Sequence, residues 1–323
     1  MVMTKNWNGF HDHFRLADSV KGLISSSAFA GKGILLLPWD DSSRYTDEMT
    51  IADLKEQFLW HSNVSGHEML AGINRLVDDV NDGWNVFHDI YTEEEMEAEP
   101  EKKNTGLFFL HGKKDAPFVL IVPGGSCYYA ASLHTGFPFA MAFNEKGYNA
   151  FVLKYRVGAG MPDEPKAEED LKRAIDFILE NAEDFGVDPD DFALCGESVG
   201  ARFCSHLVYG RADDESTERY ADSVKRPCAV ILECPILEGV PSFKPYDPAA
   251  FLITGQEDHL ATSVELQKYG EAMEKAGAHM HLEVYEHLEH GFGTGDGTAA
   301  AGWLNEAILF WESYQVHPLS EQI

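Results

Sequence analysis

A serine within the sequence Gly196-Glu-Ser-Val-Gly200 has the surroundings of a catalytic nucleophile. A serine hydroxyl attacks a carbonyl carbon only when a base takes its proton and hydrogen-bond donors hold the oxyanion. Gly196 and Gly200 leave room for a sharp turn that exposes Ser198, because a side chain at either position would meet the neighbouring strand or helix. A serine between two glycines also arises by chance in a chain with 28 Gly. The apolar run before it and the amphipathic segment after it favour the nucleophile.

Two later loops carry the acid and the histidine that such a serine needs. Asp258 follows an apolar run across a Gly turn, where a carboxylate can orient a histidine and balance its charge, although Glu257 competes for this role. His290 follows another strand-like segment and can accept the serine proton, with His287 as its competitor. The chain order Ser198, Asp258, His290 is serine, acid, histidine, unlike the two protease orders. These three residues are the predicted triad.

A glycine pair directly after a buried apolar run predicts the oxyanion donors. In Val122-Pro-Gly-Gly-Ser126, the backbone N–H groups of Gly124 and Gly125 can point at a substrate oxygen. A third donor is the N–H of Val199, at the start of the helix that follows the serine, where the helix dipole also favours negative charge.

The residues that follow this glycine pair are candidates for the substrate pocket. Ser126, Tyr128 and Tyr129 are close to the predicted oxyanion donors in sequence. Two bulky rings beside the reacting carbon would leave room for roughly two to four acyl carbons. The alternative is that both rings only pack beneath the sheet.

Metal binding is the rival chemistry. His11-Asp-His13 and His279-Met-His281 each place two imidazoles two residues apart, which on a strand puts them on the same face. Neither pair has an evident third ligand, so no metal is predicted. Val157-Gly-Ala-Gly160 lacks the third glycine of a dinucleotide loop, and no cofactor is predicted either.

The composition narrows the range of partners. With 25 Lys and Arg against 54 Asp and Glu, the net charge of −29 repels nucleic acid and anionic lipid. The sequence has no run of eighteen apolar residues and no signal-peptide core, and its five cysteines are an odd number. We therefore expect a cytoplasmic protein with a small-molecule substrate and no nucleic-acid or membrane partner. The oligomeric state is left open, a homodimer included.

Strands and helices alternate from residue 117 onward, which predicts a mostly parallel, doubly wound α/β sheet of about eight strands with helices on both faces. The run at 118–122 is apolar throughout, as in a strand that is buried on both faces. An antiparallel pair is expected at 85–91 and 105–111. Further strands are expected at 149–155, 191–195, 228–234, 250–254 and 280–285. The expected helices are 51–60, 136–146, 166–184, 199–209, 261–276 and 298–314.

The first 80 residues show little regular periodicity and read as an N-terminal extension to a catalytic domain at 81–323. Trp7, Phe10, Phe14 and Trp60 need a surface to pack against, and the body of the domain is the surface available. We expect part of 1–60 to cover the entrance to the Ser198 site. Packing on the far side of the sheet is the alternative.

From about residue 85 to the C-terminus, the chain resembles the α/β-hydrolase superfamily. Within that superfamily it is similar to the bacterial esterase and lipase branch of acetyl esterases, feruloyl-esterase-like enzymes and hormone-sensitive lipase. The motifs that carry the likeness are Gly196–Gly200, Tyr155-Arg156, Gly186–Pro189, Gly255–Asp258 and His290–Phe292. The oxyanion loop departs from the family's usual His-Gly-Gly-Gly, but its backbone donors survive that change.

This resemblance implies a serine carboxylesterase that cleaves short-chain esters through an acyl-enzyme. The same triad also serves amide, peptide and formamide hydrolysis, and only the pocket decides between them. A binding protein on a hydrolase scaffold, with an idle triad, is the alternative from outside the enzymes.

Overall fold

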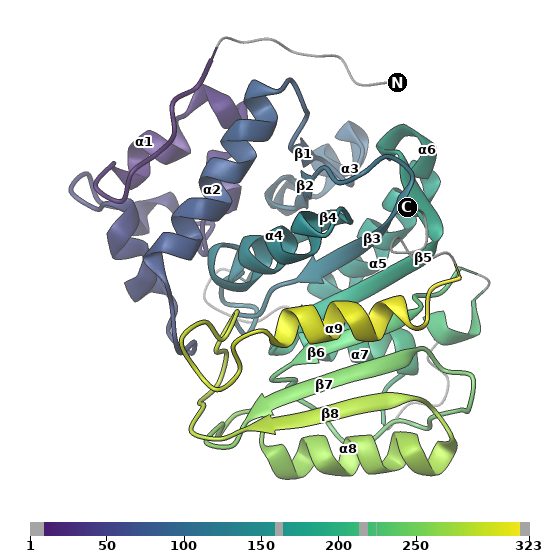
Figure 1. Ribbon diagram of the computed structural model, residues 1–323. Helices are drawn as coiled ribbons and strands as arrows, with labels where there is room; N and C mark the ends of the chain where they lie inside the picture. The colour runs from purple at the N-terminus through teal and green to yellow at the C-terminus, as the bar shows by residue number, and fades with distance from the viewer. Residues whose placement is uncertain (1–9, 159–163, 213–218, 224, 317–323) are drawn as a thin grey trace.

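One twisted sheet forms the centre of the molecule (Figure 1). The computed structural model describes residues 10–158, 164–212, 219–223 and 225–316. Over these residues the sheet has eight strands in the order β1-β2-β4-β3-β5-β6-β7-β8. The pairs β1–β2 and β2–β4 are antiparallel and the other pairs are parallel. The strands are β1 (Phe87–His88), β2 (Gly106–Leu110), β3 (Ala116–Val122), β4 (Asn149–Lys154), β5 (Val187–Glu197), β6 (Ala229–Glu233), β7 (Ala249–Gly255) and β8 (Met280–Tyr285). The predicted sheet and its antiparallel pair are confirmed.

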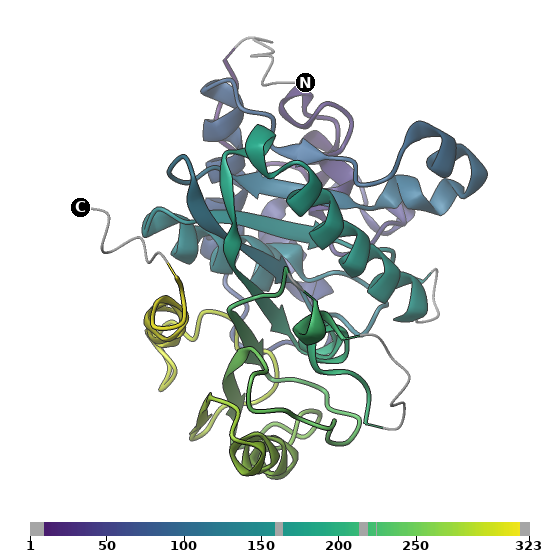
Figure 2. The ribbon, with the colours of Figure 1, turned by 90° about the vertical axis from the view of Figure 1, so that its right-hand side faces the viewer.

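Helices cover both faces of this sheet, as the sequence predicts. The helices are α1 (Val20–Ile24), α2 (Gly66–Asn81), α3 (Glu93–Ala98), α4 (Phe137–Glu145), α5 (Glu164–Glu180), α6 (Ala182–Phe185), α7 (Val199–Tyr209), α8 (Ser263–Ala276) and α9 (Trp303–Glu312). Side chains of α2, α4 and α9 pack in one core cluster, and those of α5, α7 and α8 in the other. Figure 2 shows α9 and α5 on opposite sides of the sheet. Successive residues of β3 point alternately into the two clusters because side chains alternate along a strand.

Some predicted helix boundaries differ from the observed ones. The helix predicted at 166–184 is two helices, α5 and α6, separated at Asn181. The helix predicted at 298–314 begins only at Trp303, because the preceding Gly302 has a φ of 95°, outside the range of a helix. The segment at 51–60 forms a 3₁₀ helix over Ile51–Gln57.

Helix α2 was missed in the sequence, although signals for it are present. Ser65 caps its N-terminus by accepting the N–H of Glu68, the usual Ser-x-x-Glu spacing. Met69, Ile73 and Leu76 recur at helical spacing and are fully buried. The periodicity of this short stretch is lost when residues 1–80 are read as a single unit with little regular pattern.

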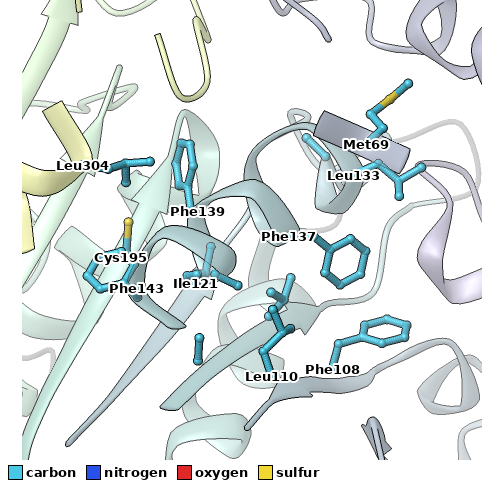
Figure 3. Close-up of a cluster of buried hydrophobic side chains, with 14 of the residues drawn as sticks. Met69, Phe108, Leu110, Ile121, Leu133, Phe137, Phe139, Phe143, Cys195 and Leu304 are labelled. Atoms are coloured by element: carbon cyan, nitrogen blue, oxygen red, sulfur yellow. The ribbon is translucent and has the colours of Figure 1, made fainter. Parts of the chain in front are cut away.

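The N-terminal segment shares its core with the sheet and α4. Figure 3 shows Met69 of α2 beside Leu133, and Phe137 and Phe139 of α4 in the same cluster. Gly72 of α2 lies so close to α4 that a Cβ there would be 2.6 Å from Phe137 Cβ. The hydrophobic core is therefore continuous across residue 80. Of the aromatic residues named above, Phe10 is 80% exposed and Trp7 lies outside the described residues.

A buried lysine ties the N-terminal segment to the end of β4. The Lys154 side chain is fully buried, and its ammonium pairs with Asp40 at 2.8 Å. It also donates to the carbonyls of Leu37 at 3.2 Å and Pro38 at 3.3 Å. A buried ammonium is stable only when its protons are satisfied, so the segment 37–40 completes the environment of this strand end.

Within the described ranges, none of the helices has the length and hydropathy needed to cross a bilayer.

Lys154→Ala should lower the free energy of unfolding by about 3–5 kcal/mol, because Asp40 and two carbonyls lose their buried partner. Urea unfolding of the wild type and the variant measures this difference. Lys275→Ala is the matched control, since Lys275 is 77% exposed and makes only a surface pair with Glu271. Its cost should stay under about 1 kcal/mol. Equal losses in the two variants would contradict the anchoring role of Lys154.

Candidate active site

Ser198 occupies a strained turn between β5 and α7. Its φ of 55° and ψ of −118° lie outside the regions that most residues adopt, and such strain is common at functional sites. The turn closes only because its glycines are small. A Cβ on Gly196 would lie 2.6 Å from the backbone of Ala201, and one on Gly200 would lie 2.1 Å from the Val122 carbonyl oxygen. The structure thus gives the two glycines the role that the sequence predicts.

The three predicted triad residues come together at the carboxyl ends of the strands. Ser198 Oγ is 2.7 Å from His290 Nε2, and His290 Nδ1 is 2.7 Å from Asp258 Oδ2. The other oxygen of Asp258 accepts the N–H groups of Leu260 and Ala261, both at 2.8 Å. All three triad side chains belong to buried residues. A continuous relay therefore runs from the hydroxyl through the imidazole to a fixed carboxylate.

The pKa values of the histidine and its acid move in opposite directions. Burial alone would lower the pKa of His290, but the hydrogen bond to Asp258 and the charges of Glu197 and Asp258 outweigh it and raise that pKa. Burial alone would raise the pKa of Asp258, but the hydrogen bond and charge of His290 and two backbone N–H groups lower it. The two shifts favour an ionised Asp258 beside an imidazole that binds its proton more tightly.

The competing residues pair with each other on the surface. His287 Nδ1 is 3.2 Å from Glu257 Oε1, and their side chains are 83% and 52% exposed. Neither residue is part of the relay formed by Ser198, His290 and Asp258.

Gly124 is the first correction to the predicted site. Its N–H donates to Oε2 of Glu197 at 2.9 Å and is therefore not available to an oxyanion. The cause is the buried carboxylate next to the nucleophile, which takes the nearest N–H of the oxyanion loop. Gly125 and Val199 are left as candidate donors. Val199 is the first residue of α7, where N–H groups have no acceptor within the helix.

Tyr129 is the second correction. Its side chain is fully buried and stacks on Trp60 at a ring distance of 5.5 Å, so it packs behind the oxyanion loop and does not line an open pocket. Tyr128 is half-buried, with its ring 5.6 Å from that of Trp60, and Ser126 is also half-buried. These two residues stay predicted pocket residues.

Two buried glutamates beside the triad were missed. Glu197 and Glu233 end the neighbouring strands β5 and β6 and face each other in register. The pKa of Glu233 lies well above its ordinary value because of burial and the charge of Glu197. Glu197 keeps a lowered pKa: burial alone would raise it, but the charge and hydrogen bond of His61 outweigh that effect. The two pKa values thus move in opposite directions, which favours the neutral form of Glu233 and the ionised form of Glu197.

His61 was also missed, since nothing in its local sequence marks it. Its Nε2 is 3.0 Å from Glu197 Oε2. The following residue, Ser62, donates its N–H to the carbonyls of His290 and Gly291, at 3.0 and 3.1 Å. The N-terminal segment thus reaches the immediate surroundings of the triad. Whether it also covers the entrance stays a prediction.

Potential metal ligands gather at two places among the described residues. One group is Cys234, Asp258 and His290, which includes two triad members. The other is His281 with Glu283 and Glu306, of which His281 belongs to one of the two histidine pairs considered for the rival metal chemistry. Its pair partner His279 lies against the ring of Tyr314 instead.

Comparisons with known proteins agree with this architecture. The BD-FAE family model matches residues 108–231, which include β3, the glycine pair after it, the turn at Ser198 and the start of β6. Endo-1,4-beta-xylanase B of Butyrivibrio fibrisolvens is 35% identical over 135 residues, 40% of this chain and 21% of that protein. Gut esterase 1 of Caenorhabditis briggsae is 32% identical over 116 residues, 33% of this chain and 19% of that protein. The matches thus span about a fifth of the length of these curated relatives.

Solved structures match a larger part of the chain. The esterase Est2 of Thermogutta terrifontis, in its propionate-bound structure, covers 72% of this chain and 95% of its own, with a TM-score of 0.58 and 20% identity. The acetyl ester-xyloside bifunctional hydrolase of Caldicellulosiruptor lactoaceticus covers 70% and 95%, with a TM-score of 0.57 and 21% identity. At this identity the likeness concerns the fold. By that likeness the chain has the α/β-hydrolase fold.

Proposed function

We propose that this chain is a serine esterase that cleaves short-chain carboxylic esters through an acyl-enzyme. The observation that carries the proposal is the relay Ser198–His290–Asp258, with 2.7 Å at both hydrogen bonds. Such a relay at a strained turn, in an α/β-hydrolase fold, is the arrangement that activates a serine.

In the first half of the reaction, His290 takes the proton of Ser198 while Oγ attacks the ester carbonyl. The N–H groups of Gly125 and Val199 hold the oxyanion that develops. Asp258 keeps the imidazole in the required tautomer and stabilises its protonated form. His290 then gives the proton to the leaving alcohol, and the acyl group stays on the serine.

In the second half, water enters and His290 accepts its proton. The resulting hydroxide attacks the acyl carbonyl, and the acid leaves when Ser198 recovers its proton. His290 thus acts first as a base and then as an acid in each half of the reaction.

Small acyl groups are the proposed substrates because of the rings around the site. The half-buried Tyr128 follows the oxyanion glycines, and its ring lies 5.6 Å from that of Trp60. We expect these rings to limit the acyl chain to roughly two to four carbons. Two matched proteins are named for xylan or xyloside chemistry, so acetylated xylosides belong among the test substrates.

A chain-length series tests the reaction class and the acyl size. Nitrophenyl esters from acetyl to decanoyl should be cleaved with a maximum at about two to four carbons, and the corresponding anilides and formamides much more slowly. EDTA should leave the rate unchanged. A maximum at about eight carbons would refute the steric argument, and faster anilide or formamide cleavage would favour an amidase.

Substitutions in the relay should separate its members. Ser198→Ala should abolish turnover and labelling by a fluorophosphonate without unfolding the protein. His290→Ala should be nearly as severe, and Asp258→Asn somewhat milder, since single triad removals cost about four to six orders of magnitude. The matched control is His287→Ala, which should retain activity because His287 is exposed. If the wild type neither turns over esters nor reacts with the fluorophosphonate, the triad is idle.

The pH profile of kcat/KM should rise along a single limb. Only neutral His290 accepts the serine proton, so activity falls as pH drops through its pKa. Because that pKa is raised, the limb should lie above pH 6.5, the ordinary value for histidine. Steady-state rates between about pH 5 and 9 measure it. A rate independent of pH over this range would contradict His290 as the base.

A further inference from the structure

One side chain of the N-terminal segment lies among the three loops that carry the reacting groups. His61 Nδ1 is 2.9 Å from the hydroxyl of Tyr129, which belongs to the oxyanion loop. Its Nε2 is 3.0 Å from Glu197, the neighbour of the nucleophile. Its ring also packs on the base loop, where a Cβ on Gly291 would lie 2.8 Å from His61 Cδ2. His61 thus contacts all three loops.

The protons of this network follow from its partners. The proton on His61 Nε2 points at Glu197, because a carboxylate only accepts, and Nδ1 is paired with the Tyr129 hydroxyl. That arrangement gives the buried carboxylate a donor. The side chains of His61 and Glu197 are each 1% exposed, so neither is placed to touch substrate. Any effect of His61 on the reaction therefore passes through the groups that it holds.

Glu197 connects this histidine to the reacting atoms. Its Oε2 also accepts the N–H of Gly124 and so fixes the Pro123–Gly124 peptide. The next peptide along the chain carries the N–H of the proposed donor Gly125. Its Oε1 is 3.9 Å from His290 Nε2 and accepts no hydrogen bond from any residue that the structure describes. One carboxylate thus orients the oxyanion loop and places negative charge beside the imidazole that becomes protonated during attack.

We propose that His61 is a positioning residue of the Ser198 site, holding Glu197 so that the oxyanion loop and the charge beside His290 are in place before substrate arrives. This inference rests on the proposed esterase function. A residue of the N-terminal segment thus helps to position the reacting groups, whether or not that segment also covers the entrance.

The competing explanation is that His61 only fills space. Its ring lies 5.9 Å from Phe58 and 5.1 Å from His134, in an aromatic cluster that would stabilise the segment with any ring at this position. The two explanations predict different activities for a variant with a phenyl ring at position 61. Such a ring keeps the packing, and it removes both hydrogen bonds.

The test compares His61→Phe, His61→Gln and the control His67→Phe in the full chain. Phenylalanine keeps the ring, glutamine keeps an N–H for Glu197, and His67 is an exposed histidine of the same segment. For each variant, four quantities are measured: thermal unfolding, the fraction of Ser198 labelled by a fluorophosphonate, kcat and KM for nitrophenyl acetate, and the inhibition constant of a short trifluoromethyl ketone. The ketone forms a tetrahedral oxyanion adduct, so it reports on the oxyanion donors.

For His61→Phe we expect full labelling after extended incubation, an unchanged KM, and kcat lowered about 10–100-fold. The trifluoromethyl ketone should weaken by a similar factor, because both effects have the same origin. His61→Gln should recover kcat to within about fivefold of wild type, and His67→Phe should stay within about twofold.

A double-mutant comparison tests whether His61 acts through Glu197. In a Glu197→Gln background, His61→Phe should lower kcat by less than about threefold, because the carboxylate that it holds is already gone. Independent, multiplicative losses would overturn the proposed route.

Other outcomes also overturn the inference. One is a folded, fully labelled His61→Phe with wild-type kcat and inhibitor affinity. Another is a loss of activity that only follows the unfolded fraction, with wild-type kcat per labelled site. If wild-type protein is neither labelled nor active, the proposed function itself fails, and a positioning role for His61 fails with it.

Discussion

The hydrogen bond between Ser198 and His290 is the contact on which the rest of the arrangement depends. It joins the turn after β5 to the loop after β8, two strands that are separated by β6 and β7 in the sheet. The strands β5 and β8 run parallel, so their carboxyl ends lie at the same edge of the sheet. The loops that follow them can therefore bring Ser198 Oγ within 2.7 Å of His290 Nε2. The strained dihedral angles of Ser198 and the glycine contacts around it are the local cost of aiming the hydroxyl at that edge. The sheet supplies the rigidity that maintains them.

Buried charge sets a second condition on the site. Asp258, Glu197 and Glu233 all lie within the carboxyl edge of the sheet, in a chain that already carries a net charge of −29. Three ionised carboxylates there would repel one another strongly in a poorly solvated environment. Each of the three carboxyl groups is stabilised in a different way. Asp258 is held by His290 and backbone N–H groups, Glu197 is held by His61 and Gly124, and the raised pKa of Glu233 favours its neutral form. Each carboxyl has a different local reason for its protonation state.

Sequence patterns predicted those parts of the molecule that depend on near neighbours. Apolar runs identified most of the sheet, and the turn residues around Ser198, Asp258 and His290 predicted the relay, because each lies at the end of a recognisable strand. Gly124 and Tyr129 were assigned wrongly because their partners, Glu197 and Trp60, are distant in sequence. His61 carries no local signal at all. It is one histidine among 14, in a segment with little periodicity, and only tertiary contacts give it a place.

The docking of residues 61–63 also bears on how the protein is made. His61 contacts a residue 136 positions later, and Asn63 donates to the carbonyl of Phe292, 229 positions later. Contacts between residues so far apart in the sequence form late in folding, because closing the long loop between them costs conformational entropy. During synthesis on the ribosome, the first part of the chain emerges long before β8 and the loop after it exist. Residues 61–63 therefore lack these partners until Glu197 and the loop at 290–292 have also emerged. A nascent chain of this protein would gain its complete site only after the loop that carries His290 has emerged.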